Sequence, residues 1–259
     1  MQRTTPDIPT RSHAGGFTLI ELLIVVAIIA LLVSILLPSL ARAKDQARRL
    51  LCLTNLRNMS TATQTYAADN NDQYPIAYYT EAVGDVLTSY AWDFTTIRDR
   101  STRSVDVMPG LLWHGQGDSR VQQCPSFDGG HNWTADPYTG YNYNTSYVGH
   151  GQKEGIVAPA RLDDVRSPVD CALFGDGEYS GGANKFMRSP FPSDSDAGFT
   201  ARSAGTQGFR HLGTTCVAWA DGHAGWLDQR HTETIPSQVD SIADGTGFLS
   251  ADNSAYDLE

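Results

Sequence analysis

Two histidines and an aspartate near the C-terminus are the first candidates for chemistry. Nine residues separate His211 from the Asp221-Gly222 pair, and His223 follows directly. Imidazole and carboxylate groups can transfer protons or bind metals. However, residues 214–220 read as a strand, which at about 3.3 Å per residue puts roughly 20 Å or more between His211 and Asp221. We therefore expect His211 to hydrogen-bond a loop and Asp221 to serve a turn.

A metal role is the alternative for the residues of this region. The candidate ligands are Asp221 with His223, or Asp176 with Glu178 in a Gly-Asp-Gly-Glu turn. Clustered oxygens would favour Ca²⁺, whereas an imidazole would favour Zn²⁺. Apart from a structural Ca²⁺, which stays open, no cofactor is expected. Because the chain has no Walker loop, G-x-S-x-G elbow or H-E-x-x-H helix, we expect no catalytic residues and no enzyme.

Four scattered cysteines offer thiol chemistry. Cys52, Cys124, Cys171 and Cys216 are too few for a disulfide-dense scaffold, and none belongs to a C-x-x-C pair. A Cys52–Cys124 disulfide is the favoured pairing, and Cys171 with Cys216 could face each other on neighbouring strands. Buried free thiols are the alternative for both pairs, since unpaired cysteine behaves as a small hydrophobe.

An acidic residue inside an apolar run is the most informative feature near the N-terminus. Residues 17–37 form 21 consecutive positions in which only Glu21 is charged. As a helix this segment is about 30 Å long, which matches the thickness of a bilayer core. A carboxylate in such a helix is costly unless it has a partner. If the chain were cut after Gly16, the free amine of Phe17 in one subunit could neutralise Glu21 of its neighbour.

The run from Gly16 to Glu21 (GFTLIE), followed by the apolar segment, resembles the processing signal of type IV pilins and type II secretion pseudopilins. Pro38 stands where such proteins often have a helix-kinking proline. The resemblance implies a leader of residues 1–16, cleavage between Gly16 and Phe17 by a prepilin peptidase, and N-methylation of Phe17 by the same enzyme. Glu21 would then serve assembly.

The family resemblance also implies partners and a location. Such a chain sits in the inner membrane with its N-terminus inside and its head outside the cytoplasm or in the periplasm. It packs against other pilin-like subunits through its helix and depends on an inner-membrane assembly platform with its ATPase. The implied function is that of a structural subunit of a pseudopilus or pilus-like filament. A membrane-tethered binding module or enzyme that uses this export route is the alternative.

A second resemblance lies near the C-terminus. The segment 211–222, with His211, Asp221 and Gly222, resembles the H-X9-DG segment of a large group of bacterial prepilin-like proteins. The region around Cys52 and the Cys124-Pro125 pair also resemble that group. Both resemblances concern the same kind of protein, although they lie almost 200 residues apart.

The elements that position these residues make an α+β fold with a small antiparallel sheet and long loops. We expect a membrane helix over 17–38, an amphipathic continuation over 39–68, and a head over 69–259. Apolar and small residues recur at helical spacing in the second segment. They are Ala41, Ala47, Cys52, Leu56, Met59, Thr63 and Tyr66. The run Asp69-Asn70-Asn71-Asp72 should end the helix.

Strand signals are strongest late in the head. We expect strands over 171–174, 214–220 and 224–227, with Asp221-Gly222 as a two-residue hairpin turn between the last two. The polar segment 234–259 should be a loosely ordered tail that lies on the domain. Residues 1–68 carry a net charge of +4 and the remainder carries −14. Because so acidic a head repels phosphate backbones, we do not expect nucleic-acid binding.

Overall fold

The computed structural model describes residues 17–113, 119–131, 135–152, 158–180, 182–194 and 196–259. The expected leader 1–16, including Gly16, lies outside the described residues. The chain divides into two compact units, residues 1–44 and 45–259. They share one helix, α1 (Leu19–Asp69), which agrees with the expected helix over 17–68.

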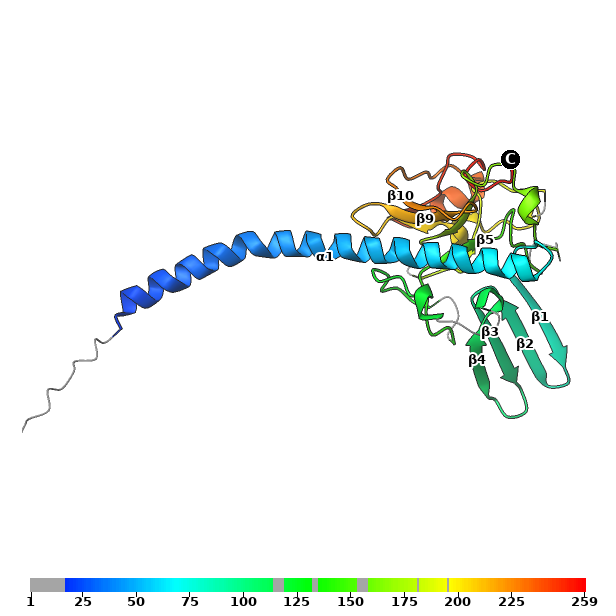
Figure 1. The fold of residues 1–259 in the computed structure, drawn as a ribbon, viewed down its shortest axis with the longest axis horizontal. Helices are drawn as coiled ribbons and strands as arrows, with labels where there is room; N and C mark the ends of the chain where they lie inside the picture. Colours follow the sequence, from blue (N-terminus) through cyan, green and yellow to red (C-terminus); the bar gives the residue numbers. More distant parts are fainter. Residues whose placement is uncertain (1–16, 114–118, 132–134, 153–157, 181, 195) are drawn as a thin grey trace, which may run out of the picture. The chain divides into compact units, whose positions relative to one another are not determined.

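The first unit contains the apolar part of α1 (Figure 1). The large apolar residues between Phe17 and Leu40 are all exposed. This part is long and apolar enough to cross a membrane, judged by length and composition. Pro38 lies inside α1, and the helix continues on both sides of it. Since none of the described residues covers this apolar surface, it is available to lipid or to other helices.

The second part of α1 packs against the head along one face. Cys52, Leu56, Met59 and Thr63 are buried, as their spacing predicted, whereas Ala47 is exposed. Cys52, Leu56 and Met59 join a core that contains Trp92, Tyr143 and Phe174. Full burial of one residue such as Leu56 stabilises the fold by about 1.5–3 kcal/mol. The helix ends at Asp69, and the next residues turn the chain through positive φ angles of 54° at Asn71 and 60° at Asp72.

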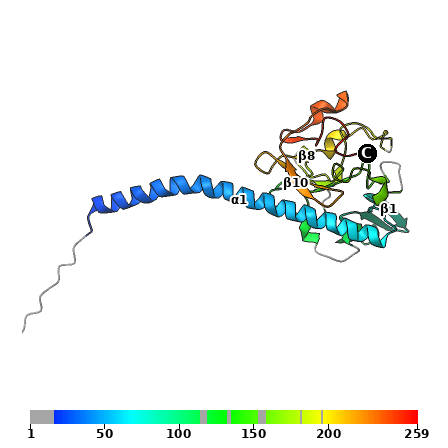
Figure 2. The ribbon, with the colours of Figure 1, turned by 45° about the horizontal axis from the view of Figure 1, so that its top comes forward.

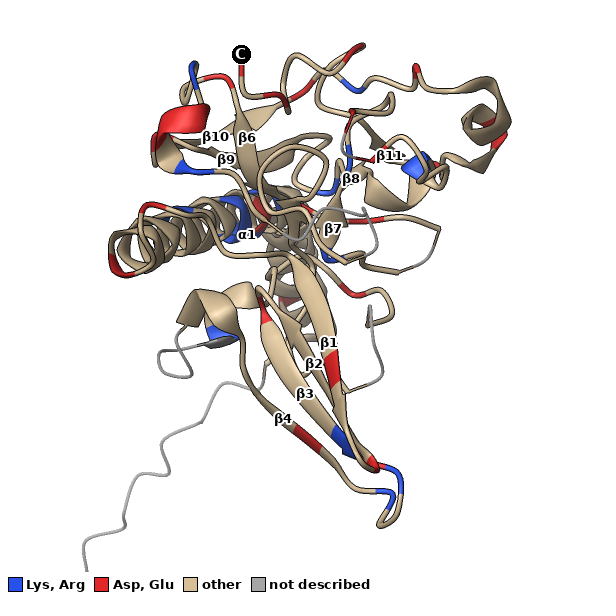
Figure 3. Ribbon diagram, turned by 90° about the vertical axis from the view of Figure 1, so that its right-hand side faces the viewer, with Lys and Arg blue, Asp and Glu red and all other residues tan. Residues whose placement is uncertain are grey.

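The described residues of the head form three sheets, which can be followed in Figures 1 and 3. The first is an antiparallel meander that we did not predict, in the order β1 (Tyr78–Val83), β2 (Val86–Ala91), β3 (Phe94–Asp99) and β4 (Val105–Pro109). The second has the order β10 (Ala224–Leu227), β9 (Thr215–Trp219), β6 (Ala172–Gly175), β5 (Asn142–Asn144) and β7 (Phe186–Met187). The third pairs β11 (Thr246–Gly247) with β8 (Gln207–Gly208).

The predicted hairpin forms between β9 and β10, but with a longer loop. The N–H of Trp219 donates to the carbonyl of His223 at 3.0 Å. The loop therefore has three residues, 220–222, rather than the expected two. Gly222 closes it with φ = 94°, a conformation that favours glycine. Strand β6 covers the expected strand at 171–174 to within one residue.

The segment 234–259 lies on the head, as expected, but the prediction that it is loosely ordered is wrong. It folds back over the head (Figure 2) and buries Phe248, Leu249 and Tyr256 against Val217 and Met187. Phe248 and Leu249 are adjacent and Tyr256 follows seven residues later, so these few apolar residues form no run that predicts a helix or a strand. Their burial depends on the sheet that they cover.

Candidate functional site

The start of α1 holds Glu21 in a capping box. The Glu21 carboxylate accepts hydrogen bonds from the backbone N–H of Thr18 at 2.9 Å and from its hydroxyl at 2.8 Å. In return, the Glu21 N–H donates to the Thr18 hydroxyl at 3.2 Å. Reciprocal bonds of this kind satisfy donors that the first helical turn leaves free. Phe17 is 71% exposed beside this turn, so both ends of the proposed pairing are accessible.

A second candidate site is a buried cluster in the head. Cys52, Cys124, Asp176 and His211 are all buried, and one potential ligand atom from each lies within 4.8 Å of those of the others. Cys52 comes from α1, Asp176 directly follows β6, and His211 precedes β9. Cys124 lies just after the short 3-10 helix η2 (Ser119–Gln122). Four segments far apart in the sequence therefore meet at one point.

The carboxylate of Asp176 is the centre of this cluster. Its Oδ1 lies 3.2 Å from Cys52 Sγ and 3.7 Å from Cys124 Sγ. Its Oδ2 accepts a hydrogen bond from the backbone N–H of Cys216 at 2.7 Å and lies 3.4 Å from His211 Nε2. His211 Nε2 is also 3.5 Å from Cys124 Sγ. The other ring nitrogen, Nδ1, is buried without a hydrogen-bond partner among the described residues.

Arg210 closes the cluster from one side. Its Nε donates to Cys124 Sγ at 3.3 Å and its Nη2 donates to Asp176 Oδ1 at 3.1 Å. Its Nη1 donates to Glu178 at 3.0 Å. Burial alone would lower the pKa of Arg210, but the negative charge of Asp176 raises it, so the guanidinium stays charged. Arg210 therefore supplies the positive charge that the buried carboxylate needs.

The pKa values of the titrating groups in this cluster shift in different directions. Burial raises the pKa of the Cys52 and Cys124 thiols well above the usual value, so both are protonated at neutral pH in this arrangement. Burial would also raise the pKa of Asp176, but Arg210 and His211 outweigh it and the pKa is lowered. Burial would lower the pKa of His211, but its contacts with Asp176 and Cys124 raise it to about 9.

The sequence predicted the members of this cluster but not their meeting. His211 was expected to hydrogen-bond a loop, and its ring contacts two loop residues, Asp176 and Cys124. Cys52 and Cys124 do lie together, but as free thiols, so the predicted disulfide is not formed. Cys171 is not paired with Cys216 either, because its thiol donates to the carbonyl of Tyr256.

The two residue pairs considered as metal ligands, Asp176 with Glu178 and Asp221 with His223, do not bring their own ligand atoms together as a metal site. Asp176 and Glu178 do not form an oxygen cluster, because both bind the guanidinium of Arg210. Asp221 serves the hairpin turn, as predicted: its Oδ1 accepts the backbone N–H of His223 at 3.0 Å and lies 2.6 Å from His223 Nδ1. Both side chains are more than one-third exposed. The two ends of the 211–222 segment therefore contact different partners.

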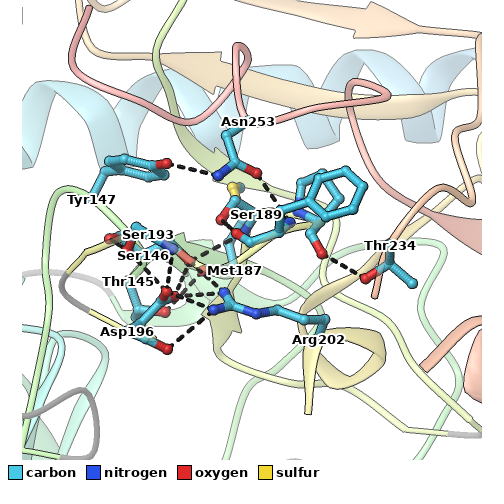
Figure 4. A network of polar contacts seen from close by, with 12 residues as sticks. Thr145, Ser146, Tyr147, Met187, Ser189, Ser193, Asp196, Arg202, Thr234 and Asn253 are labelled. Carbon is cyan, nitrogen blue, oxygen red and sulfur yellow. Dashed lines mark hydrogen bonds and ion pairs between the residues drawn. The ribbon is translucent and has the colours of Figure 1, made fainter. Parts of the chain in front are cut away.

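A further buried network surrounds Asp196 and Arg202 (Figure 4). The guanidinium donates to both carboxylate oxygens at 2.6 Å, and neither side chain is exposed. Ser146 and Ser193 donate their hydroxyls to the same carboxylate at 2.7 and 2.9 Å. Burial would raise the pKa of Asp196, but these bonds outweigh it and lower the pKa. Nothing in the residue spacing indicated this network.

Comparison with known proteins concerns the N-terminal part of the chain. The model of the prokaryotic N-terminal methylation motif matches residues 11–37. A type IV wide pilus major component, PilA4, of Thermus thermophilus is 44% identical over 59 residues, which cover 23% of this chain and 45% of that protein. Type II secretion system core protein G of Pectobacterium carotovorum is 35% identical over 60 residues, covering 23% of this chain and 38% of that protein.

A third relative matches a segment of similar length. Type II secretion system core protein G of Klebsiella michiganensis is 34% identical over 65 residues, covering 25% of this chain and 45% of that protein. Each match therefore spans less than half of the relative's length. No solved structure matches the chain.

The methylation motif, the relatives and the long apolar α1 make this a prepilin-like protein with a pilin-like α+β architecture. These features fit a membrane-anchored protein.

Proposed function

We propose that the chain is a structural subunit of a type II secretion pseudopilus or a type IV pilus-like filament, and not an enzyme. The observation that carries this proposal is the coincidence of the methylation motif at residues 11–37 with the exposed apolar part of α1. An apolar helix segment that no described residue covers needs lipid or other helices as its environment. In a filament, the packed helices of other subunits provide this environment.

Assembly begins in this proposal with removal of residues 1–16 and methylation of Phe17. The chain waits in the inner membrane with its N-terminus inside and its acidic head in the periplasm. Its partners are the prepilin peptidase, other pilin-like subunits and the assembly platform. Support comes from the match to pilin and pseudopilin relatives over the same part of the chain.

Glu21 sets the axial register between neighbouring helices. An ionised carboxylate in an apolar bundle is costly unless a cation pairs with it. The capping box leaves the charge in place, because Thr18 supplies neutral donors only. The methylated amine of a neighbouring Phe17 is the cation that removes this cost. A single polar contact in an apolar helix bundle can define register in the same way.

The test separates the charge of Glu21 from its capping role. The chain is expressed with a prepilin peptidase and the other assembly components, and its N-terminus is determined by mass spectrometry. We expect a mature chain that begins at N-methyl-Phe17 for wild type, Glu21→Ala, Glu21→Gln and the control Ser34→Ala. Glutamine keeps the cap acceptor without the charge.

Filament fractions then distinguish the variants. Wild type and Ser34→Ala should enter filaments, whereas both Glu21 variants should stay in the membrane. Assembly by Glu21→Gln alone would assign the requirement to the cap. An unprocessed Met1 terminus, or normal assembly of both Glu21 variants, would contradict the proposal. A membrane-tethered binding module would show no dependence on Glu21.

A further inference from the structure

We propose that Cys52, Cys124, Asp176 and His211 bind a zinc ion inside the head. Among the described residues they form the one cluster of at least three such side chains whose ligand atoms lie close enough to share an ion. Two thiols, an imidazole and a carboxylate are the ligand types of four-coordinate zinc sites. The sulfur atoms argue against Ca²⁺ and Mg²⁺, which take oxygen ligands.

The spacing of the ligand atoms is close to that around a four-coordinate zinc ion. With Zn–S bonds of about 2.3 Å and Zn–N or Zn–O bonds of about 2.1 Å, sulfur lies roughly 3.6 Å from a nitrogen or oxygen ligand. The sulfur distances to Asp176 Oδ1 are 3.2 and 3.7 Å, and Cys124 Sγ is 3.5 Å from His211 Nε2. Nitrogen and oxygen ligands should be about 3.4 Å apart. His211 Nε2 lies 3.4 Å from the other carboxylate oxygen, Asp176 Oδ2, so the thiols and the imidazole face different oxygens of the same carboxylate.

A cation also lies beside the cluster. Two thiolates and a carboxylate with a neutral imidazole carry three negative charges, and Zn²⁺ leaves one of them uncompensated. The guanidinium of Arg210 lies next to this charge, since it donates to Cys124 Sγ and to Asp176 Oδ1, and it also pairs with the partly exposed Glu178. Groups that hydrogen-bond to metal ligands in this manner orient them and tune the affinity of the site.

The consequence of zinc binding is a cross-link between distant parts of the head. Cys52 lies on the buried face of α1, whereas the other three ligands lie on loops of the head. Because zinc binds the folded arrangement more tightly than the unfolded chain, it stabilises the head by an amount that grows with the logarithm of its affinity. Zinc therefore acts here as a structural ion.

The test measures metal binding by the full chain in detergent. The protein is reduced, stripped with a chelator and titrated with Zn²⁺ alone, with elemental analysis of the bound metal. Titration with Co²⁺ reports the ligands, because thiolate coordination gives a near-ultraviolet charge-transfer band and tetrahedral geometry gives strong visible bands. We expect one ion per chain and both cobalt signatures in wild type. The cobalt spectrum of the wild-type protein therefore tests thiolate coordination without any substitution.

Variants then assign the ligands. Cys124→Ser and His211→Gln should weaken zinc binding by at least tenfold. Cys171→Ser is the matched control, since Cys171 is equally buried but contacts the Tyr256 carbonyl instead; it should bind like wild type. Tryptophan fluorescence verifies that each variant is folded.

Three results would overturn the proposal. The first is the absence of stoichiometric zinc or cobalt in reduced wild type. The second is a cobalt complex without the thiolate band. The third is a Cys52–Cys124 disulfide in freshly isolated protein, together with no metal uptake after its reduction.

Discussion

The head contains two buried aspartate–arginine pairs with different surroundings. Asp196 binds Arg202 and the hydroxyls of Ser146 and Ser193, all at 2.9 Å or less. Asp176 binds Arg210 at 3.1 Å and has two thiols at 3.2 and 3.7 Å. Hydroxyls are strong donors, whereas thiols are weak ones. The first carboxylate is therefore fully satisfied by the protein.

This comparison separates a structural ion pair from a site that can bind a metal ion. The hydroxyls around Asp196 cannot ionise at neutral pH, so a cation would gain no new anionic ligand there. The thiols beside Asp176 can lose their protons to a metal, which converts weak donors into strong ligands. The two aspartate–arginine pairs thus differ in their ability to bind a metal ion because of the side chains that surround them.

The largest expected effect comes from removing one partner of the satisfied pair. Arg202→Leu leaves Asp196 buried without a cation, which should reduce the free energy of unfolding by about 3–5 kcal/mol with or without zinc. Urea unfolding followed by tryptophan fluorescence measures it, because all five tryptophans lie beyond residue 90. Arg166→Leu is the control. Its pair with Glu259 is exposed, so the loss should be below about 1 kcal/mol. Equal losses for both variants would contradict the prediction.

Acid should weaken the Asp196 pair in a defined direction. The pKa of Asp196 is lowered in the folded state, so its stabilising contribution is fully present above the unfolded value of about 3.9 and is lost as the pH falls through the folded value. The free energy of unfolding of wild type should fall as the pH drops below about 4. The free energy of unfolding of Asp196→Asn should be lower at neutral pH and should fall less as the pH drops. Parallel pH curves for the two proteins would contradict this.

The smallest expected effect concerns the two ends of the 211–222 segment. His211 and Asp221 are separated by β9, five residues long, or about 16 Å. In a double-mutant cycle of His211→Ala and Asp221→Ala, the coupling should be below about 0.5 kcal/mol. The comparison cycle of His211→Ala and Asp176→Asn should show about 0.5–3 kcal/mol, because these side chains touch. Strong coupling between His211 and Asp221 would show that the segment acts as one unit.

Local features of this protein were predictable because their signals are local. An uninterrupted apolar run with one acid predicts the first part of α1 by length alone. The buried face at Cys52, Leu56, Met59 and Thr63 follows from helical spacing, and the β9–β10 hairpin follows from the Asp221-Gly222 turn. These elements need little information from the rest of the chain.

The β1–β4 meander was missed because its strands alternate poorly. Strand β1, for example, has three half-buried residues followed by three exposed ones, and β4 is mostly exposed. A strand that buries neither face fully has no clear two-residue period. The C-terminal segment was missed for a related reason, since its few apolar residues are buried only by the sheet beneath them.

The sequence by itself determined the prepilin-like N-terminus, the length of α1 and its buried face, because composition, periodicity and turn chemistry act within a few residues. Only the tertiary structure brought Cys52, Cys124, Asp176 and His211 together. The segments that carry them are separated by 35 to 72 residues of chain, and their approach depends on how α1 packs against the loops that follow β6 and precede β9. Such contacts are set by the packing of the whole core, which no local pattern encodes.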